Sequence, residues 1–347
     1  MQFDVRDFVV PADDRTGAFE MASEMACADA PVCVVVGVGA CEGDAERRRG
    51  GVVIDIDTRS RPGAQAAARA AAVEALSAKW SAHKIDSMLR GQWRAEIRER
   101  MRVGGRRALV VPAWPEMGRT CVEGVVHIDG RAYASVRQQV PDARLLRNMS
   151  DLSHWLAHGN HIAVCDVRDS TMLLEVADAV ADADPEVLVV GPAGALGAVG
   201  RRRLGLGPPA ARPAPTWPAL VVCGSASDVA HEQLARLASL HPRVEIVADL
   251  PASGNLVPAV SHMVAARAAT RLEHTEFHTV VVIGGATAAA LLGDQPRLVG
   301  GTVLPGLPWS RTVRGDGPLV VTKAGAFGHR DTLVELFSGA EREGTKG

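Results

Sequence analysis

Short runs of Val, Ile and Leu alternate along the chain with Ala-rich segments, and this alternation limits the possible folds more than any other feature. In the first half, such runs lie at 8–10, 32–36, 52–56, 109–111, 162–165 and 187–190. Continuous apolar runs without polar alternation are typical of strands that helices cover on both faces, as in a parallel sheet. The sequence therefore predicts an α/β fold with largely parallel sheets.

A change in composition divides the chain into two parts. Residues 201–218 are rich in arginine and proline and poor in long apolar side chains, which indicates an interdomain linker. A second series of apolar runs follows at 220–223, 244–247, 279–283 and 319–322. A chain of 347 residues suits two domains. We therefore expect α/β domains at 1–212 and 213–347 with a cleft between them, and a single helix over the Ala-rich segment 63–80.

Composition disfavours several classes of partner. Aromatic residues make up only 4% and the net charge is -2, so neither stacking platforms nor a broad basic face for nucleic acid is expected. The longest mostly apolar stretch, 280–292, is too short for a membrane span, and no secretory signal is recognised. Six scattered cysteines without a C-x-x-C pair are typical of buried thiols in a cytoplasmic protein.

Paired acids follow the first predicted strand. Asp13 and Asp14 precede Thr16 and Gly17. One Asp in this position would most simply cap a helix. Two adjacent acids at the carboxyl end of a strand, where doubly wound sheets bind ligands, favour a ligand site instead.

A second charged loop, residues 83–93, combines both signs of charge. Its cations suit a substrate carboxylate. Asp86 could accept the proton of a substrate hydroxyl. Asp14 could equally be the base while Asp86 orients hydroxyls, and a solvated charged turn is the simpler alternative. The candidate substrate-binding residues are Asp13, Asp14, Arg59, Lys84, Asp86, Ser87 and Arg90, and the catalytic candidates are Asp86 and Asp14.

Two glycine-rich loops in the second half, 283–291 and 321–328, are of the kind whose backbone amides hold phosphates. Close packing of a strand against a helix explains such glycines equally well. No P-loop motif is present in the sequence.

The four segments, in this order, resemble the four-carbon acid sugar kinases. Members of that family carry ADD-x-TGA, K-x-DS-x-LRG, GG-x-TA and TK-x-G-x-FG. Here these motifs stand at 12–18, 84–91, 284–288 and 322–328, with weaker matches at 57–60, 111–120, 191–197 and 221–227. The resemblance spans nearly the whole chain. The family's usual threonine after DS is Met88 in this sequence, which bears on substrate identity.

The resemblance implies an ATP-dependent kinase that phosphorylates a hydroxyl, the terminal one in the family, of a sugar acid such as threonate or erythronate. The first domain would bind the substrate and the second the nucleotide, with Mg²⁺ on the phosphates. A homodimer is the common default for such an enzyme. The implied nucleotide contacts are Ser225, Gly284, Gly285, Thr287, Lys323 and Gly325.

Two other functions stay open. The chain could have kept the fold as an inactive ligand-binding or regulatory protein. The glycines at 37–43 could serve a nicotinamide-dependent dehydrogenase, although their spacing breaks G-x-G-x-x-G. The helically spaced His154, His158 and His161 suggest zinc, but Gly159 and Asn160 should end that helix first.

Overall fold

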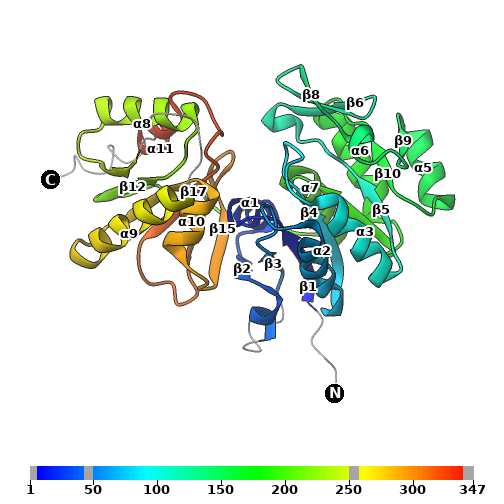
Figure 1. Ribbon diagram of the computed structural model, residues 1–347, viewed down its shortest axis with the longest axis horizontal. Helices are drawn as coiled ribbons and strands as arrows, with labels where there is room; N and C mark the ends of the chain where they lie inside the picture. The colour runs from blue at the N-terminus through cyan, green and yellow to red at the C-terminus, as the bar shows by residue number, and fades with distance from the viewer. Residues whose placement is uncertain (1–5, 43–49, 250–257, 339–347) are drawn as a thin grey trace. The chain divides into compact units, whose positions relative to one another are not determined.

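The computed structural model describes residues 6–42, 50–249 and 258–338 (Figure 1). Its contacts divide the chain into two units, Met1–Pro208 and Pro209–Gly347, and each is described by itself. The division falls within the proline-rich stretch 201–218. Gly43, which belongs to the glycine series at 37–43, lies outside the described residues.

The first unit is built on a parallel sheet of eight strands in the order β2-β3-β1-β4-β11-β5-β10-β9. The apolar runs of the sequence form its buried centre, as predicted. The strands are β1 (Arg6–Ala12), β2 (Val32–Val36), β3 (Val52–Asp55), β4 (Ala78–Lys84), β5 (Arg107–Val110), β9 (Arg144–Leu146), β10 (Ala163–Cys165) and β11 (Val187–Gly191).

Helices connect these strands, as parallel pairing requires. They are α1 (Arg15–Met25), α2 (Gly63–Ala71), α3 (Trp93–Gly104), α4 (Val136–Gln139), α5 (Met149–His158), α6 (Ser170–Ala181) and α7 (Ala193–Leu204). A small antiparallel sheet interrupts the series with β6 (Arg119–Val122), β7 (Val125–Ile128) and β8 (Arg131–Ser135).

In the second unit the strands follow the order β13-β12-β14-β17-β16-β15. The first four strands are parallel, and β16 and β15 are antiparallel. The elements are β12 (Ala219–Cys223), α8 (Asp228–Leu240), β13 (Glu245–Ala248), α9 (Pro258–His274), β14 (Thr279–Ile283), α10 (Gly285–Leu292), β15 (Arg297–Leu304), β16 (Leu307–Thr312), β17 (Leu319–Lys323) and α11 (Thr332–Ser338).

Successive residues of the apolar runs pack into two hydrophobic cores, one on each face of this sheet. Val221 and Val281 belong to the core that includes Leu234 of α8 and Leu336 of α11. Val222 belongs to the other, with residues of α9 and α10. Burial on both faces is why these strands read as unbroken apolar runs. The prediction of α/β units with largely parallel sheets is confirmed.

Two predictions, of one helix and of the start of the linker, were wrong. The segment 63–80 is not one helix, because α2 ends at Ala71, a short 3₁₀ turn covers 72–75, and β4 begins at Ala78. Alanine favours helix locally, but pairing of β4 with both β1 and β11 outweighs that preference. The linker also starts later than predicted, because α7 continues through Leu204, and Gly205 caps it in the left-handed conformation.

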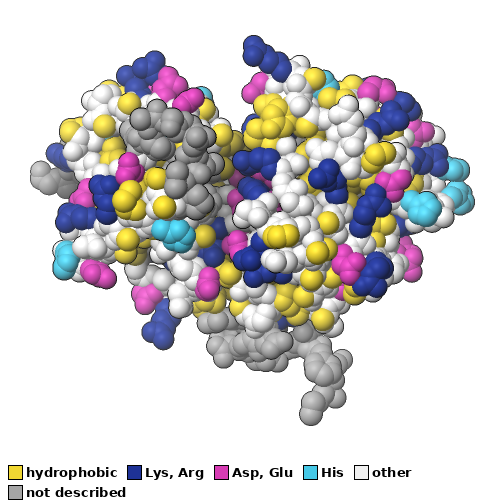
Figure 2. All heavy atoms as spheres, viewed as in Figure 1, with side chains coloured by type: hydrophobic (Ala, Val, Ile, Leu, Met, Phe, Trp, Pro, Cys, Tyr) yellow, Lys and Arg dark blue, Asp and Glu magenta, His cyan; other side chains and the backbone are white. Residues whose placement is uncertain are grey.

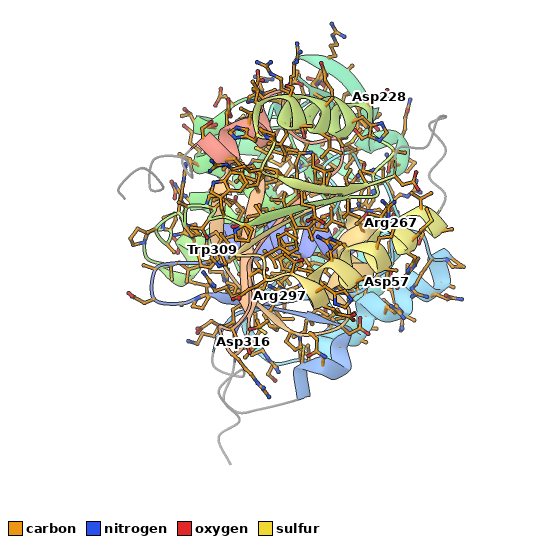
Figure 3. The ribbon with its side chains drawn as sticks, turned by 90° about the vertical axis from the view of Figure 1, so that its left-hand side faces the viewer. Asp57, Asp228, Arg267, Arg297, Trp309 and Asp316 are labelled. Atoms are coloured by element: carbon orange, nitrogen blue, oxygen red, sulfur yellow. The ribbon has the colours of Figure 1, made fainter. Side chains whose placement is uncertain are left out.

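The antiparallel strands β15 and β16 were not predicted from the sequence. Figure 3 labels Arg297 on the first strand and Trp309 on the second. Gly300 of β15 leaves room for the Trp309 ring, because a Cβ at this position would lie only 2.2 Å from that ring. The glycine pair at 300–301 divides the apolar residues of β15 into two short groups, which concealed the pattern that identified the parallel strands.

Candidate functional site

The first unit collects its charged residues where three neighbouring strands end. β1 lies between β3 and β4, and Ala12 at its end is in register with both Asp55 and Lys84. Because all three strands are parallel, the loops that follow them meet at one edge of the sheet. The predicted residues at 13–14, 59 and 84–90 are thereby brought together.

Arg59 is the centre of this charged cluster. Its Nε and Nη2 donate to the two carboxylate oxygens of Asp13 at 2.7 and 2.8 Å, and its Nη1 donates to Asp14 at 2.7 Å. Its Nη2 also lies 3.4 Å from Asp86 Oδ1. One guanidinium therefore joins three carboxylates that come from two other loops.

Asp13 and Asp14 have different environments although they are adjacent. Asp13 is only 2% exposed. Burial raises its pKa to about 6, and the charge of Arg59 opposes that rise. Asp14 is the N-cap of α1, where it accepts from Gly17 N at 2.7 Å and from the Thr16 hydroxyl at 3.0 Å. The capping explanation is therefore correct for Asp14, and the same side chain also belongs to the charged cluster.

Asp86 is held by its own loop. Arg90 donates to it in a bidentate manner at 2.7 and 2.8 Å, and the backbone amides of Met88 and Arg90 also donate to it. Burial alone would raise the pKa of Asp86, but the hydrogen bonds from Arg90 and the charge of Arg59 outweigh burial and hold that pKa well below its usual range. Ser87 lies half-buried in the same turn.

Lys84 ends β4 and is 2% exposed. Its Nζ donates to the Ile85 carbonyl at 3.0 Å and lies 3.7 Å from Glu20 Oε2. A Cβ on Gly17 would lie 3.0 Å from that Nζ, so the glycine of the TGA motif leaves room for the ammonium. Sequence reasoning missed Glu20. The signal was its helical spacing from Thr16, which places both residues on one face of α1.

The second unit gathers its predicted residues in the same way. Cys223, Ile283 and Lys323 are the ends of β12, β14 and β17 and stand in register. Gly284 follows with φ of 103°, a conformation that side chains rarely adopt. A Cβ on Gly325 would lie 2.1 Å from the Ser225 hydroxyl, so the two loops are in close contact.

Two buried hydroxyls in this unit have no hydrogen-bond partner among the described residues, those of Thr287 and Thr322. Such a group costs about 1–3 kcal/mol unless a ligand satisfies it. Thr287 lies in α10, which begins at Gly285. Lys323 is 1% exposed and donates to the carbonyls of Ala324 and Gly325 at 2.9 and 3.1 Å. Burial lowers its pKa to about 8.

The two other motifs noted in the sequence lie on α5 and after β2. α5 ends at His158, with Gly159 as C-cap, as predicted. A 3₁₀ turn over Val38–Glu42, not an α-helix, follows the glycine at 37.

On the face shown in Figure 2, basic and acidic side chains are interspersed. In the described ranges, no three His, Cys, Asp or Glu residues are grouped to hold a metal ion. Nor does any described helix have the length and apolar character of a membrane span.

Known proteins match both units. Residues 8–144 match the family model of a sugar-binding N-terminal domain, and residues 245–333 match that of a nucleotide-binding C-terminal domain. A D-threonate kinase of Bordetella bronchiseptica is 28% identical over 97% of this chain and 98% of its own length. The D-threonate kinase of Cupriavidus necator is also 28% identical, over 94% and 96%.

A solved structure from Salmonella typhimurium LT2 shares the fold, with a TM-score of 0.72 at 18% identity over 96% of this chain and 99% of that one. Fold, charged cluster and family models together define a two-domain α/β protein with separate sugar-binding and nucleotide-binding domains. In both domains the chain is similar to the four-carbon acid sugar kinase family that its motifs resemble.

Proposed function

We propose that this protein transfers the γ-phosphoryl group of ATP to a hydroxyl of a four-carbon sugar acid of the threonate or erythronate type, D-threonate being the first candidate. The main support is the charged cluster around Arg59, which joins cations and hydroxyl-binding carboxylates at one sheet edge. The D-threonate kinases that match nearly the whole chain support the same substrate class.

In this proposal the cations of the first unit bind the substrate carboxylate. Arg90 is the most accessible of them, with a side chain 56% exposed, and a guanidinium can bind a carboxylate in a bidentate manner. The paired acids accept hydrogen bonds from the substrate hydroxyls, together with Ser87. Because Asp86 is so strongly paired, it is fixed in position and orients the substrate through Arg90.

The nucleotide phosphates would lie on the glycine loops of the second unit. Gly284 is the N-cap of α10 and its own amide donates to the Lys323 carbonyl, while Gly285 begins the first turn, whose amides have no acceptor within the helix. Helix amino ends of this kind favour anions. The unpartnered Thr287 hydroxyl fits a phosphate oxygen. Ser225, Gly325 and Lys323 complete the proposed contacts. Mg²⁺ would bind to the phosphates with few protein ligands.

A panel of sugar acids, assayed with ATP and Mg²⁺ for ADP release and for the phosphorylated product, tests the proposal. We expect turnover with D-threonate or a stereoisomer. No product with any member of the panel would overturn it.

Asp14→Asn and Asp86→Asn separate an enzyme from an inactive binding protein, since both variants should lose phosphorylation while retaining ligand binding. Sedimentation tests the predicted homodimer.

A further inference from the structure

Glu20 is a charged residue of the substrate site that the motifs do not contain. It lies on α1 four residues after Thr16, so one face of the helix carries both. Its Oε2 is 3.7 Å from Lys84 Nζ, and its side chain is 19% exposed. Asp14, at the start of the same helix, is also 19% exposed. Glu20 is therefore as open to a small ligand as the predicted site residue Asp14.

The other acids of the site have little capacity left to accept a proton. Asp86 accepts four hydrogen bonds from Arg90 and Met88. Asp14 accepts three, and Asp13 is buried against Arg59. Glu20 differs, because within the described ranges its carboxylate accepts no hydrogen bond and its one ion pair, with Lys84 at 3.7 Å, is too long for a hydrogen bond. A carboxylate has about four acceptor positions, so those of Glu20 remain for a substrate hydroxyl.

The charged groups that act on Glu20 come from three neighbouring loops and strands. They are Asp14 before α1, Lys84 on β4, Asp86 after β4 and Arg59 after β3. Glu24, one turn further along α1, interacts more strongly with Glu116 and Arg201 than with Glu20. Burial raises the pKa of Glu20, and the charges of Asp14 and Asp86 add to that rise, while Lys84 and Arg59 oppose it. A carboxylate with a raised pKa is a better proton acceptor near neutral pH than the strongly paired Asp86.

We propose that Glu20 is the general base of the kinase reaction, an inference that rests on the proposed function. The acceptor hydroxyl gives its proton to a carboxylate oxygen of Glu20 as its oxygen bonds to the γ-phosphorus. The bond from that phosphorus to the β–γ bridging oxygen breaks, and ADP leaves with its electron pair. Lys84 holds the carboxylate in position, and the neutral acid then returns its proton to solvent. Asp86 and Asp14 orient the substrate.

Steady-state kinetics of Glu20→Gln with D-threonate, or the best acid of the panel, test this assignment. Removing a general base should lower kcat about 10²- to 10⁴-fold, while the Kd of the sugar acid, measured by calorimetry, changes less than about threefold. The wild-type kcat/KM should fall as pH falls through the raised pKa of Glu20, because the base must be ionised. That acidic limb should be missing in the variant.

Chemical rescue keeps the test independent of folding. Sodium formate should restore activity to Glu20→Ala, because formate can occupy the space of the lost carboxylate, and it should not activate Asp86→Ala. Glu24→Gln, one turn along the same helix, is the matched control and should keep the wild-type kcat. If Glu20→Gln retains kcat within about threefold, or loses affinity for the acid with kcat unchanged, Glu20 is not the base. A wild-type protein without turnover would instead overturn the kinase function itself.

Discussion

The two units use similar sheet edges to build different binding surfaces. In the first unit, three strand ends bring together Arg59 and three carboxylates, and almost every charge has a partner. In the second unit, three strand ends bring together glycines, hydroxyls and one buried lysine, and two hydroxyls have no partner within the described residues. A sugar acid is distinguished by its hydroxyls and carboxylate, which requires directed side chains. Phosphates are alike in all nucleotides and can be held by backbone amides.

The largest effect should follow from removing the centre of the first surface. Arg59→Ala leaves Asp13, Asp14 and Asp86 facing each other without the shared cation. Loss of one partner of such a hydrogen-bonded charge pair costs about 2–5 kcal/mol. We therefore expect kcat/KM for the sugar acid to fall by a hundredfold or more, with a lower free energy of unfolding by about 3 kcal/mol. Kinetics and urea unfolding measure the two effects.

Arg61→Ala is the matched control in the same loop. Arg61 pairs with Asp57, whose side chain is 57% exposed. Exposed pairs contribute about 0–1 kcal/mol, so both measurements should stay near those of the wild type. Equal losses in Arg59→Ala and Arg61→Ala would show that the loop as a whole, and not the charged cluster, matters.

Gly284→Ala should damage the second surface alone. Its φ of 103° is strained for any residue with a Cβ, at about 1–3 kcal/mol. The KM for ATP should rise about tenfold or more, while the Kd of the sugar acid stays unchanged. Gly207→Ala is the control, since a Cβ there meets nothing within 4 Å and its φ is ordinary. A change in sugar-acid affinity alone would contradict the assignment of this loop to the nucleotide.

Thr287→Val separates binding from stability. The hydroxyl is buried without a described partner, so its replacement by a methyl group of similar size should leave stability unchanged or raise it by about 1 kcal/mol. Loss of a phosphate contact should at the same time raise the KM for ATP about fivefold to tenfold. Calorimetric melting and ATP titration give the two values. A destabilised variant with normal KM would show that the hydroxyl serves the fold.

The smallest effect concerns pH. The pKa of Lys323 is lowered to about 8 by burial, so its ammonium loses its proton as pH rises through that value. If Lys323 helps to hold phosphates, the KM for ATP should rise a few-fold between pH 7 and pH 9. Lys323→Met should have a high KM that does not change over this range. A wild-type KM that is equally flat would remove Lys323 from the nucleotide contacts.

The sequence predicted the features that depend on continuous patterns. Apolar runs located the parallel strands, and because parallel strands end at one edge, the residues that follow them were correctly expected to meet. The strand β4 was missed because it begins shortly after the Ala-rich segment 63–75, which favours helix, and because its pairing partners β1 and β11 are distant in sequence. Glu20 was missed because its proximity to Lys84 depends on how α1 packs on the sheet, which no motif records.

The two oxygens of Asp14 have separate tasks. One begins α1 through the amide of Gly17, while the other contacts Arg59. Secondary structure and electrostatics therefore converge on a single carboxyl group at the amino end of the helix. Substitution by asparagine preserves an oxygen for the amide and removes the charge, whereas alanine removes both. The difference between those two variants measures how much of the residue's importance is architectural.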